Sequence, residues 1–237
     1  MKIAYWLPAL ASSVLLFGCG QTTEGNPDAS PATPAASESA PPTSPASGQK
    51  QKAPLPSSDQ SKTDPQKREP QNGDPVGVID TGKGKIVVMF FPDKAPTHVA
   101  NFQGLASDKF YDGTKFHRTM PGFMIQGGDP NTKTADQSSW GQGGPGYSVK
   151  AEFNDIHHAR GILSMARSGD PDSAGSQFFI MVGDNSSLDG QYTVFGKVVK
   201  GMDVADAIVA LPSEPGSGTA KQPVTIKSIR IEKWPVQ

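Results

Sequence analysis

The segment FHRTMPGFMIQGGD, residues 116–129, sets a single arginine among bulky apolar side chains and an uncharged amide. Pro121 and Gly122 favour a tight turn, so two short antiparallel strands are predicted on either side of it. An arginine carries several N–H donors in a fixed planar arrangement, and at the edge of an apolar pocket Arg118 could bind a neutral polar backbone. The alternative interpretation is a structural arginine that lies over the edge of the core.

Apolar, β-branched and aromatic runs around this segment predict a mainly β domain. Strands are expected at 76–80 and 85–91 with a hairpin turn between them, around Phe116, Met124, Ile162, Phe178 and Val194, and near 224–234. The last strand breaks its alternation at Lys227 and Ser228, which indicates a β-bulge. Helices are expected from Pro96 to just before Tyr111 and over 202–211. Together these elements predict an antiparallel barrel or sandwich with helical caps.

Three other features of the sequence do not indicate a binding site. The segment GQGGPG, residues 141–146, has no preceding strand and no helix after Pro145, so nucleotide binding is not expected. His157 and His158 would point to opposite faces of a strand, and no third ligand lies at a suggestive spacing, so a surface pair is expected rather than a metal site. The net charge of −1 and the lack of a basic cluster argue against a nucleic-acid partner.

The N-terminus has the pattern of an export signal. A charged start is followed by the apolar run 3–17, which is too short for a comfortable membrane span. The run ends in LFGC, residues 16–19, which resembles the bacterial lipobox and implies cleavage before Cys19 and lipidation of its thiol. Cys19 is the only cysteine, so a disulfide within the chain is excluded. The alternative is an ordinary signal peptide that happens to contain a cysteine.

The next stretch has the composition of a tether. About half of the 22 prolines lie in 20–75, which contains no aromatic residue and too few apolar side chains to offset the entropy of the chain. It is therefore predicted to be disordered, with a root-mean-square span of about 40 Å if it is flexible. The expected organisation is a signal peptide at 1–18, a lipidated cysteine and tether at 19–75, and one folded domain at 76–237.

The segment 116–129 resembles the cyclophilin signature FHRxxPGFMxQGGD at every fixed position. The segments GILSMAR (161–167) and SAGSQFFI (173–180), and residues 188–198, resemble further parts of that family and follow in the family's order. The resemblance implies an eight-stranded antiparallel barrel closed by two α-helices, with the active groove on its outer face. It also implies peptidyl-prolyl cis/trans isomerase activity without a cofactor or a metal.

Carried over position by position, the resemblance assigns site residues. Arg118 is the expected catalytic residue, and His117 beside it is expected to support the site. The remaining positions are expected to contact the substrate: Phe123, Met124, Phe179 and Leu188 around the proline ring, Gln126 and Gln177 near the peptide backbone, Ala166 and Arg167 on the facing edge, and Tyr192 where the family often has a histidine near the groove.

The expected function is folding assistance to exported Pro-containing polypeptides at a membrane surface. That surface would be the periplasmic side of an outer membrane or the outer face of a plasma membrane, and the protein is expected to be a monomer. A rival hypothesis is a binding module that holds proline loops without turnover. A hydrolase or a solute-binding lipoprotein is disfavoured, because the chain lacks a nucleophile–base set and a two-domain length.

Overall fold

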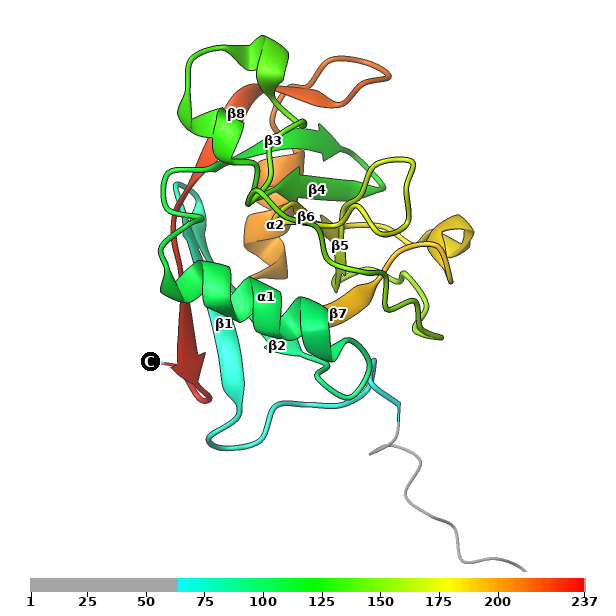
Figure 1. The fold of residues 1–237 in the computed structure, drawn as a ribbon. Helices are drawn as coiled ribbons and strands as arrows, with labels where there is room; N and C mark the ends of the chain where they lie inside the picture. Colours follow the sequence, from blue (N-terminus) through cyan, green and yellow to red (C-terminus); the bar gives the residue numbers. More distant parts are fainter. Residues whose placement is uncertain (1–63, 237) are drawn as a thin grey trace, which may run out of the picture. The chain divides into compact units, whose positions relative to one another are not determined.

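The computed structural model describes residues 64–236. Within this range, eight strands form a closed antiparallel barrel (Figure 1). The strands are β1 (Pro75–Thr81), β2 (Gly84–Phe90), β3 (Lys115–Met120), β4 (Met124–Gly127), β5 (Ile162–Met165), β6 (Phe178–Met181), β7 (Val194–Lys200) and β8 (Thr219–Lys233). Their order around the barrel is β1-β2-β7-β5-β6-β4-β3-β8. The barrel is therefore confirmed, and the sandwich alternative is wrong.

Two α-helices accompany the barrel, as predicted. Helix α1 (Pro96–Ser107) packs against β7 and β8, and α2 (Met202–Val209) packs against β2, β3 and β4. Pro96 fits the first turn of α1 because the N–H that it lacks would have no partner inside the helix. The short 3-10 helices are η2 (Pro130–Lys133), η3 (Gln137–Ser139) and η4 (Ser186–Leu188).

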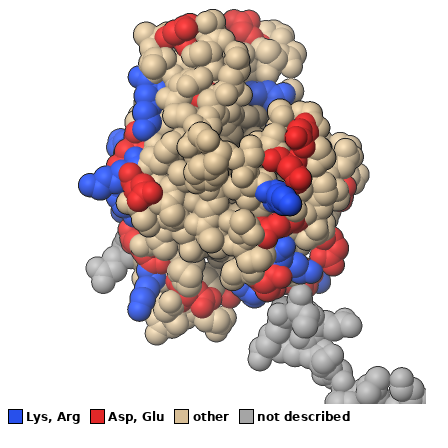
Figure 2. All heavy atoms as spheres, viewed as in Figure 1, with Lys and Arg blue, Asp and Glu red and all other residues tan. Residues whose placement is uncertain are grey.

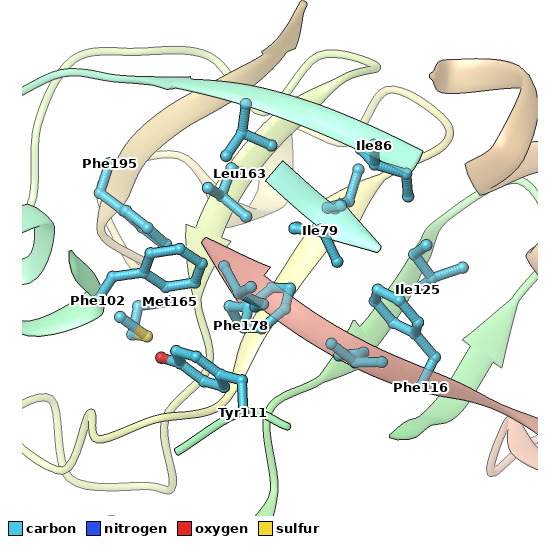
Figure 3. Close-up of a cluster of buried hydrophobic side chains, with 14 of the residues drawn as sticks. Ile79, Ile86, Phe102, Tyr111, Phe116, Ile125, Leu163, Met165, Phe178 and Phe195 are labelled. Carbon is cyan, nitrogen blue, oxygen red and sulfur yellow. The ribbon is translucent and has the colours of Figure 1, made fainter. Parts of the chain in front are cut away.

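Alternation along the strands separates an interior core from an outer apolar cluster. Phe102, Tyr111 and Phe116 surround Phe178 in the interior core (Figure 3), and Phe195 packs on Phe102. Neighbouring ring centroids in this group lie 5.1 to 6.1 Å apart. The outer cluster includes Met124, Phe179 and Met181. Because successive residues of a strand point to opposite faces, β6 supplies both sets.

An irregularity in β3 places Arg118 on the outer face. The β3–β8 register shifts between Phe116 and Arg118. Phe116 belongs to the interior core, whereas Arg118 pairs with Gln126 and contacts its side chain. Residues two apart share a face in a regular strand, so the irregularity separates these two side chains.

Strand β8 is longer than predicted. The sequence predicts this strand near 224–234, whereas β8 begins at Thr219. In the structure Pro223 lies in the irregular stretch between Thr219, which pairs with Arg118, and Val224, which pairs with Phe116. The predicted bulge in this strand is confirmed, since the register with β1 skips Lys227.

Residues 64–74 lie against the barrel ahead of β1. The nearly buried Lys197 donates to the carbonyl oxygen of Gln66 at 2.7 Å, and the Gln66 amide donates to the carbonyl oxygen of His157, also at 2.7 Å. Arg68 lies over the Phe91 ring, 5.9 Å from its centroid. These contacts hold residues 66 and 68 against the folded domain, whereas the domain boundary at residue 75 stays a prediction.

The export signal, Cys19 and the rest of the predicted tether lie outside the described residues. In the part of the chain that the structure describes, no helix has the length and hydropathy needed to cross a bilayer.

Candidate active site

A row of paired residues crosses the outer face of β3, β4 and β6. Arg118 pairs with Gln126, and Gln126 pairs with Phe179. Directly paired residues of antiparallel strands project on the same face. The guanidinium, the amide and the phenyl ring therefore stand side by side, and Met124 lies in the next row of the same face.

Neutral acceptors hold the Arg118 side chain. Its Nε donates to the carbonyl oxygen of Ser217 at 2.9 Å, and its Nη1 donates to Gln126 Oε1 at 3.5 Å. Arg160 and Arg230 each pair with an aspartate, but no carboxylate within residues 64–236 lies at salt-bridge distance from Arg118. Its charge is thus not neutralised by this part of the chain, and these two contacts use only two of its five N–H donors.

A chain of amides continues from the arginine. Gln126 Nε2 donates to Gln177 Oε1 at 2.9 Å, and Gln177 Nε2 donates to the carbonyl oxygen of Gly143, also at 2.9 Å. Because the Gln126 oxygen faces Arg118, its NH₂ group must face Gln177. Each amide orientation is therefore fixed by its neighbour, and both glutamines are held at the edge of one groove.

The predicted apolar residues come together beside these polar groups. Met124 and Phe179 are buried in the outer cluster, and Phe123, Leu188, Tyr192 and Ala166 pack against it half-buried. The rings of Phe179 and Tyr192 meet edge to face, with centroids 5.8 Å apart. An apolar surface of this kind suits contact with a small ring such as that of proline, which offers no hydrogen-bond donor.

The end of β6 fixes the turn that carries Phe123. The carbonyl oxygen of Phe123 accepts hydrogen bonds from Val182 N at 2.9 Å and Gly183 N at 3.2 Å. A β-carbon at Gly183 would overlap the carbonyl oxygen of Gly122, so this approach requires a glycine. The strand and the turn therefore determine jointly where Phe123 stands.

A groove of about 710 Å³ adjoins the glutamines. It is lined by Gln126, 141–148, 166–168, Ser173 and 175–177. Arg167 is the only charged side chain in that lining. Figure 2 shows that uncharged residues cover most of the centre of the viewed face. Residues 141–148 were not predicted to line a groove, because four of these eight residues are glycines, whose backbone carries no chemical signature.

The Arg167 side chain forms hydrogen bonds and a cation–π contact with other residues of the protein. Its Nε donates to the carbonyl oxygen of Gln191 at 3.0 Å, its Nη1 donates to the carbonyl oxygen of Ser168 at 2.8 Å, and its guanidinium lies 4.7 Å from the centroid of the Tyr192 ring. A cation over an aromatic face is stabilising. Arg167 therefore orders the backbone beside Tyr192 as well as lining the groove.

Two of the predicted histidines are buried. His117 is buried and has no hydrogen-bond partner among residues 64–236, and this burial lowers its pKa. The predicted surface pair is wrong for His158, which is fully buried and contacts Asp189 and Ser164. Neither His157 nor His158 lies in a strand, so the expected alternation of faces does not apply. No group of three or more His, Cys, Asp or Glu side chains in the described part could hold a metal ion.

Comparisons with known proteins agree with this geometry. The family model described as cyclophilin type peptidyl-prolyl cis-trans isomerase/CLD matches residues 77–231. A peptidyl-prolyl cis-trans isomerase of Acinetobacter baylyi is 42% identical over 163 residues, which cover 65% of this chain and 84% of that protein. A probable peptidyl-prolyl cis-trans isomerase of Brucella abortus is 45% identical over 160 residues, which cover 65% of this chain and 81% of the relative.

A solved structure is also similar. It is the crystal structure of a Cryptosporidium parvum cyclophilin type peptidyl-prolyl cis-trans isomerase in the presence of the dipeptide Ala-Pro. It matches with a TM-score of 0.60 and 32% identity, covering 67% of this chain and 99% of that chain.

Proposed function

The chain belongs to the cyclophilin-type peptidyl-prolyl cis-trans isomerases, and on that premise we propose that Arg118 is its catalytic residue and that the enzyme acts at a membrane surface outside the cytoplasm. The observation that carries the first part is the position of Arg118. Its guanidinium stands beside the outer apolar cluster, it has N–H donors that no acceptor within residues 64–236 uses, and it has no carboxylate partner in that range.

The mechanism follows from the electronic structure of the amide. Rotation about a peptide bond costs about 18–20 kcal/mol because the nitrogen lone pair is delocalised into the carbonyl group. In the twisted transition state the lone pair localises on the prolyl nitrogen, where a guanidinium N–H can donate to it. The same donor has little to bind in the planar ground state, so Arg118 stabilises the transition state selectively.

The energy required is modest. Uncatalysed isomerisation takes about 10–100 s, so a turnover of about 10 per second requires a barrier reduction of about 3–4 kcal/mol. One preorganised donor at a developing charge is worth about 2.7–4 kcal/mol in other enzymes. A single hydrogen bond from Arg118 could therefore supply most of the rate enhancement.

The other site residues would bind and orient the substrate. We assign the proline ring to the pocket of Phe123, Met124, Phe179 and Leu188, with Tyr192 at its edge. Gln126 and Gln177 would contact the peptide backbone through the amide groups that they hold in fixed orientations. The amide of Ala166 already donates to the carbonyl oxygen of Gln177 at 2.9 Å, so the Ala166 carbonyl oxygen is assigned to the residue before proline.

Pro-containing polypeptides are the proposed substrate class. The Ala-Pro dipeptide present with the Cryptosporidium relative supports this choice. The direct test is a cis/trans exchange assay of the purified full-length protein on an Xaa-Pro peptide. A binding module would bind the peptide without accelerating its exchange, and that result would refute catalysis by this groove.

We propose that the protein is exported and held on a membrane through lipidated Cys19. The support is the apolar run at 3–17 and the lipobox-like segment at 16–19. Two or more acyl chains anchor a protein stably, whereas a single chain of the myristoyl type binds only marginally. The membrane would be the outer membrane on its periplasmic side or the outer face of the plasma membrane.

Cys19→Ser is expected to abolish fatty-acid labelling and to release the protein from the membrane fraction or leave it unprocessed. The reason is that Cys19 supplies the only thiol of the chain. Metabolic labelling with a fatty acid, followed by membrane fractionation, measures both effects. Equal labelling of the wild type and the variant would eliminate the anchor.

A further inference from the structure

The loop between β6 and β7 carries two residues of the pocket, Leu188 and Tyr192. This rim loop, residues 184–192, contains only the single turn of η4. Asn185 caps that turn by accepting a hydrogen bond from Ser187 N at 3.1 Å. Backbone hydrogen bonds from Asn185 N to the His158 carbonyl oxygen at 3.0 Å and from Gln191 N to the Leu188 carbonyl oxygen at 3.0 Å hold parts of the loop, and side-chain contacts add to them.

Asp189 connects the rim loop to the floor of the pocket. Its Oδ1 accepts a hydrogen bond from His158 N at 2.8 Å and lies 3.0 Å from His158 Nδ1. The His158 ring is fully buried and lies nearly parallel to the Phe179 ring, with centroids 6.1 Å apart. The residue next to Leu188 is thereby joined through His158 to the Phe179 ring, which we assign to the proline pocket.

His157 bridges two carboxylates of the same loop. Its Nδ1 lies 2.6 Å from Asp189 Oδ2, and its Nε2 lies 2.9 and 3.0 Å from the two oxygens of Asp184. A neutral imidazole carries a proton on one nitrogen only and would present a lone pair to the other carboxylate. The geometry therefore requires the protonated ring, and hydrogen bonds to Asp189 and Asp184 raise the pKa of His157 above its ordinary value.

The other neighbours of His157 leave this bridge intact. The Gln66 amide donates to its backbone carbonyl oxygen at 2.7 Å. A cavity of about 320 Å³ beside it is also lined by Asp64, Lys94 and Asp155. Lys94 and Asp155 form their own ion pair at 2.7 Å, and burial lowers the pKa of the adjacent His158. Asp184 and Asp189 are thus the charged groups in direct contact with the His157 ring.

We propose that His157 is a positioning residue for the isomerase reaction: its protonated ring ties Asp184 to Asp189 and so holds Leu188 and Tyr192 against the proline pocket. The inference rests on the proposed use of that pocket for the proline ring. His157 does not take part in the chemical step, so its loss affects substrate binding more than turnover.

The direction of the pH dependence follows from the protonated ring. A histidine whose pKa is raised by folding stabilises the folded structure fully at pH values below its pKa in the unfolded chain, about 6.5. That stabilisation is lost as the pH rises through its pKa in the folded protein. The KM for an Xaa-Pro peptide is therefore expected to rise about threefold to fivefold above pH 6.5, the size of effect typical of an exposed ion pair. The kcat should change little.

The test compares His157→Gln and His157→Lys in the purified full-length protein, with Asp155→Asn as the matched control for a nearby carboxylate outside the bridge. His157→Gln should show the high KM at every pH, because glutamine is uncharged. His157→Lys should keep the low KM at every pH, because lysine stays charged across the transition. Asp155→Asn should show the same rise in KM above pH 6.5 as the wild type. A rise in KM with pH that persists in His157→Gln would overturn the proposal. A rise in KM that occurs below pH 6.5 would also overturn it, because such a transition would point to His158.

A second readout separates this inference from the proposed function. Backbone NMR shifts of Leu188, Gly190 and Gln191 report the order of the rim loop without any need for turnover. A shift transition above pH 6.5 that His157→Gln abolishes supports the positioning role even if the enzyme assay fails. Turnover without such a transition would refute the positioning role and leave the catalytic proposal standing.

Discussion

Arg118→Ala is expected to lower kcat/KM on an Xaa-Pro peptide by about thirtyfold to a thousandfold in a domain that stays folded. Loss of a donor that serves only the twisted amide removes about 2–4 kcal/mol of transition-state stabilisation. The side chain is half-buried, and within residues 64–236 its hydrogen bonds go to Ser217 and Gln126, so its removal leaves the interior core unchanged. The measurement is kcat/KM together with the melting temperature.

Arg230→Ala is the matched control for removing an arginine. Arg230 lies on β8 and forms a two-point pair with Asp112 at 2.7 and 2.8 Å on the surface. Its loss should cost at most about 1 kcal/mol of stability and leave turnover unchanged. Arg118→Lys keeps the charge without the planar arrangement of donors, so it should restore only part of the rate. Near-wild-type turnover in folded Arg118→Ala would remove Arg118 from the mechanism.

The two faces of a strand could be predicted from the sequence, because they depend on the pattern of side chains along it. Alternation along 178–181 separates Phe178 and Ile180, in the core, from Phe179 and Met181, in the outer cluster. Such alternation reflects the two faces of one strand, so it is visible without coordinates. The pocket residues Phe123, Met124 and Leu188 came from the family resemblance, and the structure brings them together, while their roles in binding remain predictions.

The features that the sequence did not predict depend on contacts between residues that lie far apart in the chain. The register shift in β3 depends on how β8 pairs beyond Pro223, and no local pattern encodes that choice. The acceptors for Arg118 and Gln177 are the backbone carbonyl groups of Ser217 and Gly143, which any residue could provide. The burial of His158 depends on Asp189, which lies 31 residues away in the chain.

Gly183→Ala is expected to lower kcat/KM by about a hundredfold, because the new methyl group must displace the turn at Gly122. That turn carries Phe123 into the proposed proline pocket through the hydrogen bonds from Val182 and Gly183 to the Phe123 carbonyl oxygen. The overlapping atom is a backbone oxygen and cannot rotate away, so the turn has to move by about 1 Å. A misplacement of about 1 Å commonly costs an enzyme about a hundredfold in rate.

Gly122→Ala is the control that separates overlap from backbone strain. Gly122 has a φ of +72° and no atom within 4 Å of an added β-carbon, so the substitution strains the backbone without pushing any neighbour. It should cost about 1–2 kcal/mol of stability and leave Phe123 in place, with a much smaller change in kcat/KM. The kinetics and the melting temperature of both variants distinguish the two effects. If Gly183→Ala retained wild-type kcat/KM, the docking of β6 against the turn would not determine where Phe123 stands in the pocket.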